Sequence, residues 1–304
     1  MSIRPLIAFV VCGAAAHAAP LPALIDRPVT LRAGALDLTL QGTYTNWSAS
    51  DSVLGVRSSL AGETVALGAD FGASDAAQFG LALALPVHPG AGFGSILGSA
   101  AFAASKSVAL RIDAGFENYG FNGDTAGIRG TTHVNRFFGG LGPRIKAPLS
   151  PTVAFVMGRT GTVQFGHFNN LGDQGLGLYS GASLLTEGAS DLLVISSGNN
   201  GGTSTLTDVG VNVPLGLLLQ PDPRFALTLL AGYSAVIVIP STGSSEVLHF
   251  VPVGVEAVVT PSAPIDVGLR FFFDGYVGTT GGTSSNQGYF DTRALMLWVT
   301  VHGG

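Results

Sequence analysis

The stretch 265-IDVGLRFFFDGYV-277 alternates between two kinds of residue. Its odd positions are apolar or glycine, whereas the even positions carry Asp266, Arg270 and Asp274. Successive side chains of a β-strand point to opposite faces of a sheet, so a period of two predicts a strand with one apolar and one polar face. The rest of the chain indicates which of these faces meets water.

The same period recurs from about residue 36 to the C-terminus and predicts about twelve strands, an even number as in bacterial barrels. Short connections that contain Pro or Ser alternate with longer ones rich in Gly, Ser, Thr and Asn, which is typical of an up-and-down meander with two unlike ends. The predicted strands cover residues 36–44, 64–71, 95–103, 110–117, 136–145, 152–165, 208–219, 225–239, 251–260, 265–277 and 288–302. The pattern is clearest from residue 208 onward, is weak in 95–103, and is broken at Arg159 in 152–165. The short connections are 105–106, 148–150, 220–223 and 261–263, and the longer ones are 122–130, 240–246 and 278–288.

Residues 166–205 do not follow this scheme. Within them, residues 180–195 alternate poorly and fit a helix, a lid or two further strands. The simplest interpretation is a long outer loop, whereas two further strands would raise the total to about fourteen.

The composition favours a membrane protein without membrane helices. Charged residues make up 11% of the 304 residues, against about 25% in a typical soluble chain. No apolar run reaches the length of about 18 residues that a membrane helix needs. The non-apolar strand faces hold mainly Gly, Ala, Thr and Ser with a few charges, as in a crowded lumen, and not the Lys and Glu of a surface in water.

A bilayer also excludes open sheet edges, because each unpaired backbone group in hydrocarbon costs several kcal/mol, and closure pairs every strand. We therefore predict an all-β fold: a closed antiparallel up-and-down transmembrane β-barrel of about 12 strands, within a range of roughly 10–14. A soluble secreted β protein is the competing fold, and its recovery in the aqueous fraction without detergent would distinguish it.

The N-terminus has the pattern of a secretory signal peptide over residues 1–18. Arg4 supplies the positive charge, residues 5–16 form a short apolar core, and Ala18 ends a small-x-small cleavage pattern. The single cysteine, Cys12, falls within this peptide, so the mature chain offers no disulfide and no thiolate metal site. Residues 19–35 are predicted to be a periplasmic lead-in, and residues 36–304 the barrel with its long loop at 166–205.

In these features the chain resembles Gram-negative outer-membrane β-barrel proteins of the porin-like type. The resemblance covers nearly all of the mature chain and rests on pattern. The last strand contains 294-ALMLWVTV-301, like the closing strand of that family, although the chain ends on His302-Gly303-Gly304 where the family usually ends on an aromatic residue. The resemblance implies residence in the outer membrane after signal-peptide cleavage near Ala18, contact with outer-membrane lipid, and insertion by the barrel-assembly machinery.

Charged residues on the predicted inner faces form the most informative set. Buried charges must pair or meet water. They either line a narrow wet channel for small solutes, in which the arginines steer anions and the carboxylates bind cations, or they form salt bridges that plug a closed barrel. The predicted lumen-lining set is Asp37, Asp70, Arg111, Asp113, Glu117, Arg136, Arg144, Lys146, Asp208, Glu256, Asp266, Arg270 and Asp274.

No catalytic or metal-binding motif accompanies these charges, and the histidines are scattered along the chain. We expect each histidine of the mature chain to be a loop or interface residue, and we expect no cofactor and no catalytic residues. The 14 Lys and Arg against 19 Asp and Glu argue against a nucleic-acid partner. The leading hypothesis is passive or weakly selective passage of small solutes through a polar lumen, without enzyme activity. The alternatives are a non-conducting structural or surface-binding barrel and a barrel hydrolase that acts on lipid.

Overall fold

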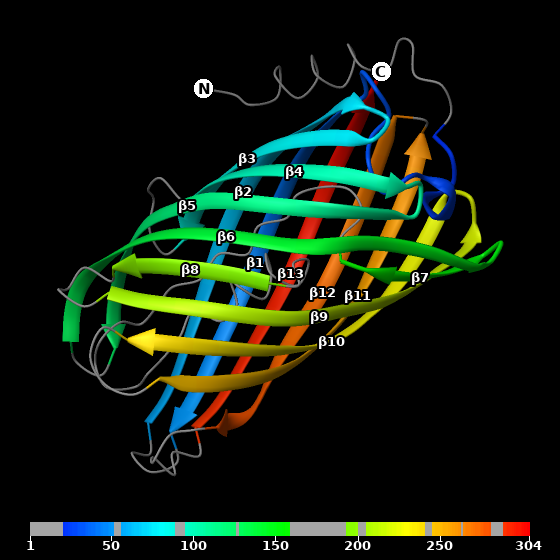
Figure 1. Ribbon diagram of the computed structural model, residues 1–304. Helices are drawn as coiled ribbons and strands as arrows, with labels where there is room; N and C mark the ends of the chain where they lie inside the picture. The colour runs from blue at the N-terminus through cyan, green and yellow to red at the C-terminus, as the bar shows by residue number, and fades with distance from the viewer. Residues whose placement is uncertain are drawn as a thin grey trace.

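The computed structural model describes residues 21–51, 56–88, 95–125, 128–158, 193–199, 205–240, 245–262, 264–280 and 288–304, and at some strand ends only the backbone is described. Strands dominate this part of the chain (Figure 1). No described helix is long and apolar enough to cross a membrane. The strand segments are β1 (Leu36–Asp51), β2 (Val56–Ser74), β3 (Ala77–His88), β4 (Ser95–Ser105), β5 (Val108–Thr125), β6 (Ile128–Ser150), β7 (Val153–Met157), β8 (Leu193–Asn199), β9 (Thr205–Asp222), β10 (Phe225–Pro240), β11 (Glu246–Ser262), β12 (Ile265–Thr280) and β13 (Gly288–Gly303).

These segments form one closed antiparallel sheet. Except for β7 and β8, consecutive segments pair with each other, and β1 pairs with β13 over its whole length, from Leu36↔Gly303 to Asp51↔Gly288, which closes the barrel. Segments β7 and β8 both pair with β6 and with β9, so they lie end to end in one strand position. The thirteen described segments therefore make a barrel of twelve strands, and the predicted fold class is confirmed.

The split strand changes the prediction for residues 166–205. β7 ends with Met157 opposite Leu215, and β8 begins with Leu193 opposite Val211 of the same neighbour. Gly158 follows β7 with φ +68°, a conformation that glycine adopts without steric cost. Residues 193–199 thus belong to the wall, because their backbone completes the ladder between β6 and β9 in the strand position that β7 begins. Residues 159–192 and 200–204 lie outside the described residues.

One end of the barrel carries short connections. Two-residue turns at 75–76, 106–107, 151–152 and 223–224 join strands at one end, which is also the end where β13 finishes (Figure 1). At the other end, the predicted long connection at 122–130 is wrong. β5 and β6 remain paired out to Thr125↔Ile128, because the Asn and Gly residues there still form the ladder.

The apolar strand faces point outward. Large apolar side chains are exposed on every side of the barrel, among them Leu67, Leu81, Phe137 and Leu297, each more than half exposed. A soluble protein of this size would bury such residues. The polar residues that alternate with them along the strands are instead buried inside the barrel, as in Asp37, Gln41, Asp70, Arg111 and Arg144. The outer surface is therefore an apolar belt suited to lipid.

The inner surface has two unlike sectors. The polar residues just named lie on β1, β2, β5 and β6, whereas Val156, Leu218, Val258 and Trp298 form a buried apolar cluster on β7, β9, β11 and β13. Gly268 on β12 makes room for this cluster, since a β-carbon there would overlap the indole ring of Trp298. This apolar sector of the wall lies among inward polar side chains, which include Asn212 on β9 and Asp266 and Arg270 on β12, whereas the alternation predicts a polar lumen throughout.

We predict that an arginine at Leu297, in the middle of the apolar belt, destabilises the barrel by about 2–4 kcal/mol in lipid vesicles, because the charge lies in hydrocarbon. Leu149 is equally exposed but lies beside a turn, so Leu149→Arg is the matched control, with an expected cost of about 0–1 kcal/mol. Urea titration of refolded protein in vesicles measures both values. Equal costs at the two positions would contradict a membrane-spanning belt.

Candidate functional site

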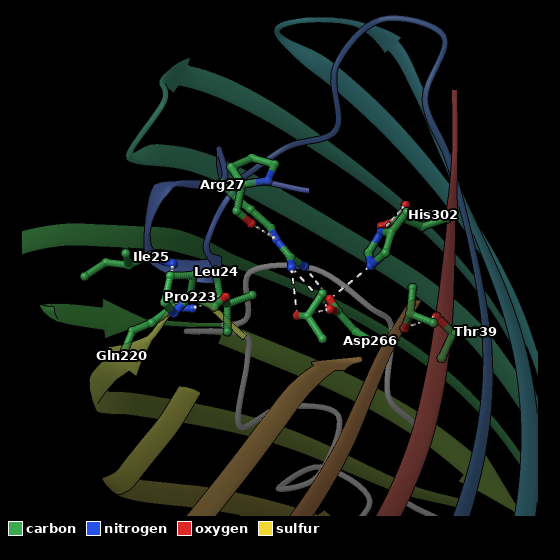
Figure 2. A network of polar contacts seen from close by, with 12 residues as sticks. Leu24, Ile25, Arg27, Thr39, Gln220, Pro223, Asp266 and His302 are labelled. Atoms are coloured by element: carbon green, nitrogen blue, oxygen red, sulfur yellow. Dashed lines mark hydrogen bonds and ion pairs between the residues drawn. The ribbon is translucent and has the colours of Figure 1, made fainter. Parts of the chain in front are cut away.

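A segment of residues 21–35, here called the strap, lies across the barrel end that carries the two-residue turns. It belongs to the predicted lead-in of residues 19–35, and hydrogen bonds join it to the inner wall (Figure 2). It contains one 3₁₀ turn, η1 (Leu24–Asp26). Pro22 and Pro28 bracket this turn and limit it to three residues, because proline fixes φ and removes an N–H donor.

Asp266, the second residue of β12, is the hub of the first anchor. Both Arg27 terminal nitrogens donate to its carboxylate: Nη1 to Oδ2, and Nη2 to Oδ1 at 3.2 Å. The Thr260 hydroxyl donates to Oδ1 at 2.6 Å, and Nε2 of His302 lies 3.0 Å from Oδ2. The Arg27–Asp266 pair is a two-pronged ion pair, the strong geometry for arginine and carboxylate. Figure 2 shows these side chains converging from the strap, β12 and β13.

His302 extends the anchor across the seam that closes the barrel. Its Nδ1 lies 2.7 Å from Oδ1 of Asp37 on β1, while Nε2 contacts Asp266 on β12. Carboxylates only accept hydrogen bonds when ionised, so contact with two of them favours a ring that carries protons on both nitrogens. The expectation that each histidine lies in a loop or interface is therefore wrong for His302, which joins three strands inside the barrel.

The second anchor holds the 3₁₀ turn against β6 and β9. The Ile25 N–H donates to Oε1 of Gln220 at 2.7 Å, and Gln220 Nε2 donates to the Pro223 carbonyl at 3.2 Å. The Lys146 ammonium donates to the carbonyl of Leu24 at 2.7 Å. The Ile25 side chain is buried in the apolar sector beside Trp298 and its neighbours. The strap thus forms hydrogen bonds with polar side chains of the wall and packs Ile25 against its apolar cluster.

The third anchor fixes the rest of the strap to β2, β3 and a turn. The Val29 N–H donates to the carbonyl of Lys106 at 3.1 Å, and the Leu31 N–H to Oε1 of Gln78 at 2.9 Å. The Gly34 N–H donates to the Gly72 carbonyl at 2.7 Å, and Gly34 has φ +79° where the chain turns into β1. The three anchors span the mouth from β12 to β2, so the strap narrows this end of the lumen.

A cavity of about 400 Å³ lies between the strap and the inner wall. Its apolar side includes Leu218, Val258, Phe272 and Trp298. Four of its lining residues are lysine or arginine and three have carboxylate side chains, and His302 contacts two of these carboxylates. The cations are Arg27, Arg32, Lys146 and Arg270, and the carboxylates are Asp37, Glu256 and Asp266.

The predicted lumen-lining residues fall into two groups. Nine have described side chains, all buried or half-buried inside the barrel: Asp37, Asp70, Arg111, Asp113, Arg144, Lys146, Glu256, Asp266 and Arg270. The side chains of Glu117, Arg136, Asp208 and Asp274 lie outside the described residues, although the backbone register sets Glu117 opposite Arg136.

Several of the nine described charges pair with one another. Arg111 donates from Nε to Asp113 at 2.9 Å, Arg144 lies 3.6 Å from the same carboxylate, and Arg270 pairs with Glu256. Asp70 accepts a hydrogen bond from Gln78. Five of the nine also line the cavity, namely Asp37, Lys146, Glu256, Asp266 and Arg270. A role for these residues in solute passage stays a prediction.

Sequence reasoning missed the residues that hold the strap: Arg27, Gln78, Gln220 and His302. Arg27 belongs to the predicted lead-in and not to a predicted strand, and the two glutamines carry no charge, so none of these three entered a search for charged residues on strand faces. An inward-facing glutamine next to a short turn is the signal that would have found Gln78 and Gln220, because a buried amide needs a partner.

The solved structures that align with this chain share its fold but have little sequence identity with it. The translocator domain of the autotransporter NalP from Neisseria meningitidis aligns with 98% of this chain and 94% of its own at a TM-score of 0.52 and 11% identity. The COG4313 outer membrane channel from Pseudomonas putida F1 aligns with 91% of this chain and 98% of its own at 0.52 and 12% identity. This chain has the fold of outer-membrane β-barrels. No known family model and no curated protein matches its sequence.

We predict that Asp266→Asn loosens the strap, because the amide loses the charge that Arg27 and His302 share. Each charge-assisted hydrogen bond contributes about 1.5–3 kcal/mol, so trypsin cleavage after Arg32 of the folded barrel should accelerate about tenfold or more. Asp222→Asn is the matched control, since Asp222 lies in an exposed turn and contacts the N–H of Arg224. Unchanged cleavage in Asp266→Asn would mean that this anchor does not hold the strap.

Proposed function

We propose that this barrel resides in the Gram-negative outer membrane and gives small solutes passive or weakly selective passage, with the strap narrowing its periplasmic mouth. The observation that carries the proposal is the cavity of about 400 Å³ between the strap and the wall, because it leaves space for a small solute inside a closed barrel. The two-residue turns beside the strap support a periplasmic position for this end, since such barrels have short turns there.

The lining supports weak selectivity. An eight-stranded barrel fills its own interior and a barrel of about sixteen strands leaves an aqueous channel. Twelve strands lie between these cases, so bulky side chains and the strap set the width. Many of the described charges lie beside an opposite charge, as Arg270 lies beside Glu256. This pairing weakens the electrostatic potential of either sign in the lumen, so selection between anions and cations is weak.

A second function is favoured by a specific observation. The strap crosses the mouth on three anchors, and the Arg111–Asp113–Arg144 group adds a salt-bridged cluster on the wall. Both features suit a non-conducting barrel that serves as a structural or surface-binding protein. The strap is then a permanent plug, and opening it has no physiological role.

The proposal assigns no reaction and no cofactor to the barrel. Among the described residues, no group of three or more His, Cys, Asp or Glu is placed to hold a metal ion. A lipid-hydrolysis assay on the folded protein tests the hydrolase alternative directly. The proposed partners are outer-membrane lipid, the barrel-assembly machinery during insertion, and the solutes themselves, with no nucleic acid.

Conductance across a planar bilayer tests passage. We expect the purified folded protein to show small unitary currents, and the double variant Asp266→Asn/Gln220→Leu to show currents several-fold larger, because two of the three anchors are then lost. Asp222→Asn should leave the current unchanged. Absence of unitary current in both the parent and the double variant would reject passage and favour the non-conducting barrel.

A further inference from the structure

The apolar side of the cavity presents aromatic surface. Trp298 on β13 and Phe272 on β12 both line it, and Val258 and Leu218 complete the same side. The absence of a side chain at Gly268 lets the indole of Trp298 lie against the wall, so the ring covers backbone and does not project across the lumen. A flat apolar wall of this kind suits a ring, because aromatic pairs stack with an offset or meet edge to face.

The polar edge of the cavity contains an unsatisfied donor. Arg270, two residues from Gly268 on β12, is about nine-tenths buried and pairs through Nη2 with Glu256. Its Nε–H is also buried, and it has no hydrogen-bond partner among the described residues. Glu256 therefore uses only part of the hydrogen-bonding capacity of this guanidinium. Because Arg270 lines the cavity, its guanidinium is placed to donate to an oxygen of a bound molecule.

The charges of the residues that line the cavity indicate which charge a bound molecule should carry. Four lysine or arginine side chains face three carboxylate side chains around the cavity, and His302 contacts two of these carboxylates. The ammonium of Lys146, which is buried, donates to a backbone carbonyl. The lining thus holds a positive excess, and an anion would be favoured over a cation in it.

We propose that this cavity binds a small aromatic carboxylate, with its ring against Trp298 and Phe272 and its carboxylate on the guanidinium of Arg270. A molecule with a single ring fits a volume of about 400 Å³, near the lower end of ordinary ligand pockets. The inference names the solute class for the proposed function and rests on that function only for passage, because binding can be measured in a barrel that does not conduct.

Fluorescence of Trp298 provides the direct measurement. The chain has two tryptophans, so Trp47→Phe leaves Trp298 as the only one. Benzoate is the probe, acetate lacks the ring, and benzamide lacks the charge. We expect saturable quenching by benzoate and about tenfold or weaker binding of the other two, a difference of about 1.4 kcal/mol. Linear, unsaturable quenching by benzoate, or equal binding of benzamide, would overturn the proposal.

Paired variants separate recognition from folding. Arg270→Gln/Glu256→Gln removes the proposed partner without leaving a lone charge, and it should weaken benzoate binding about tenfold. Arg111→Gln/Asp113→Asn is the control, because it neutralises one acid and one base of the buried Arg111–Asp113–Arg144 cluster, whose residues do not line the cavity. Both variants must keep the heat-modifiable mobility of a folded barrel on gels. Equal benzoate affinity in the two variants would overturn the role of Arg270.

Binding and conductance together distinguish the two proposals. Saturable benzoate binding without unitary current would reject passage and keep the aromatic site. Unitary current without saturable binding would keep passage and reject the site. Partial block of the current by benzoate, lost in Arg270→Gln/Glu256→Gln, is the result expected when both hold.

Discussion

Closure of the backbone hydrogen-bond ladder is the constraint on which the rest of this structure depends. In hydrocarbon an unpaired N–H or C=O has no water to meet, so the first and last strands must find each other. The continuous pairing of β1 with β13 meets this demand. Once the ladder is closed, alternate side chains must point to lipid or to the lumen, and the apolar residues take the lipid side.

Closure also explains why the N-terminal strap enters the lumen. The inward-facing polar side chains of twelve strands line the inner wall. Buried charges and amides need hydrogen-bond or ion-pair partners. Neighbouring strands supply some of them, as in the Arg111–Asp113 pair. Near the mouth the strap supplies the rest: its main chain bonds to Gln220, Gln78 and Lys146, while its Arg27 side chain meets Asp266. The strap therefore completes the polar wall and narrows the mouth by the same contacts.

The alternation in the sequence predicted the fold class, the strand number and the inward position of Asp37, Arg144 and Asp266, because each is a local consequence of a period of two. It could not predict the strap contacts, since Arg27 and Asp266 are 239 residues apart and nothing in the strap alternates. It also missed the apolar sector, because a period of two assigns Phe272 and Trp298 to a face without stating which neighbours share it. The split of one strand into β7 and β8 was missed because each piece is short.

Asp266 connects the strap to the strands that close the barrel. Its carboxylate meets Arg27 from the beginning of the described chain and His302 from its end, and His302 also meets Asp37 across the seam. These four residues come together only when β12, β13 and β1 are already neighbours. Docking of the strap at this anchor is therefore a consequence of barrel closure, and the cavity beneath the strap exists only in the closed barrel. A site built in this way cannot bind its ligand before assembly is complete, which ties recognition to the folded state in the membrane.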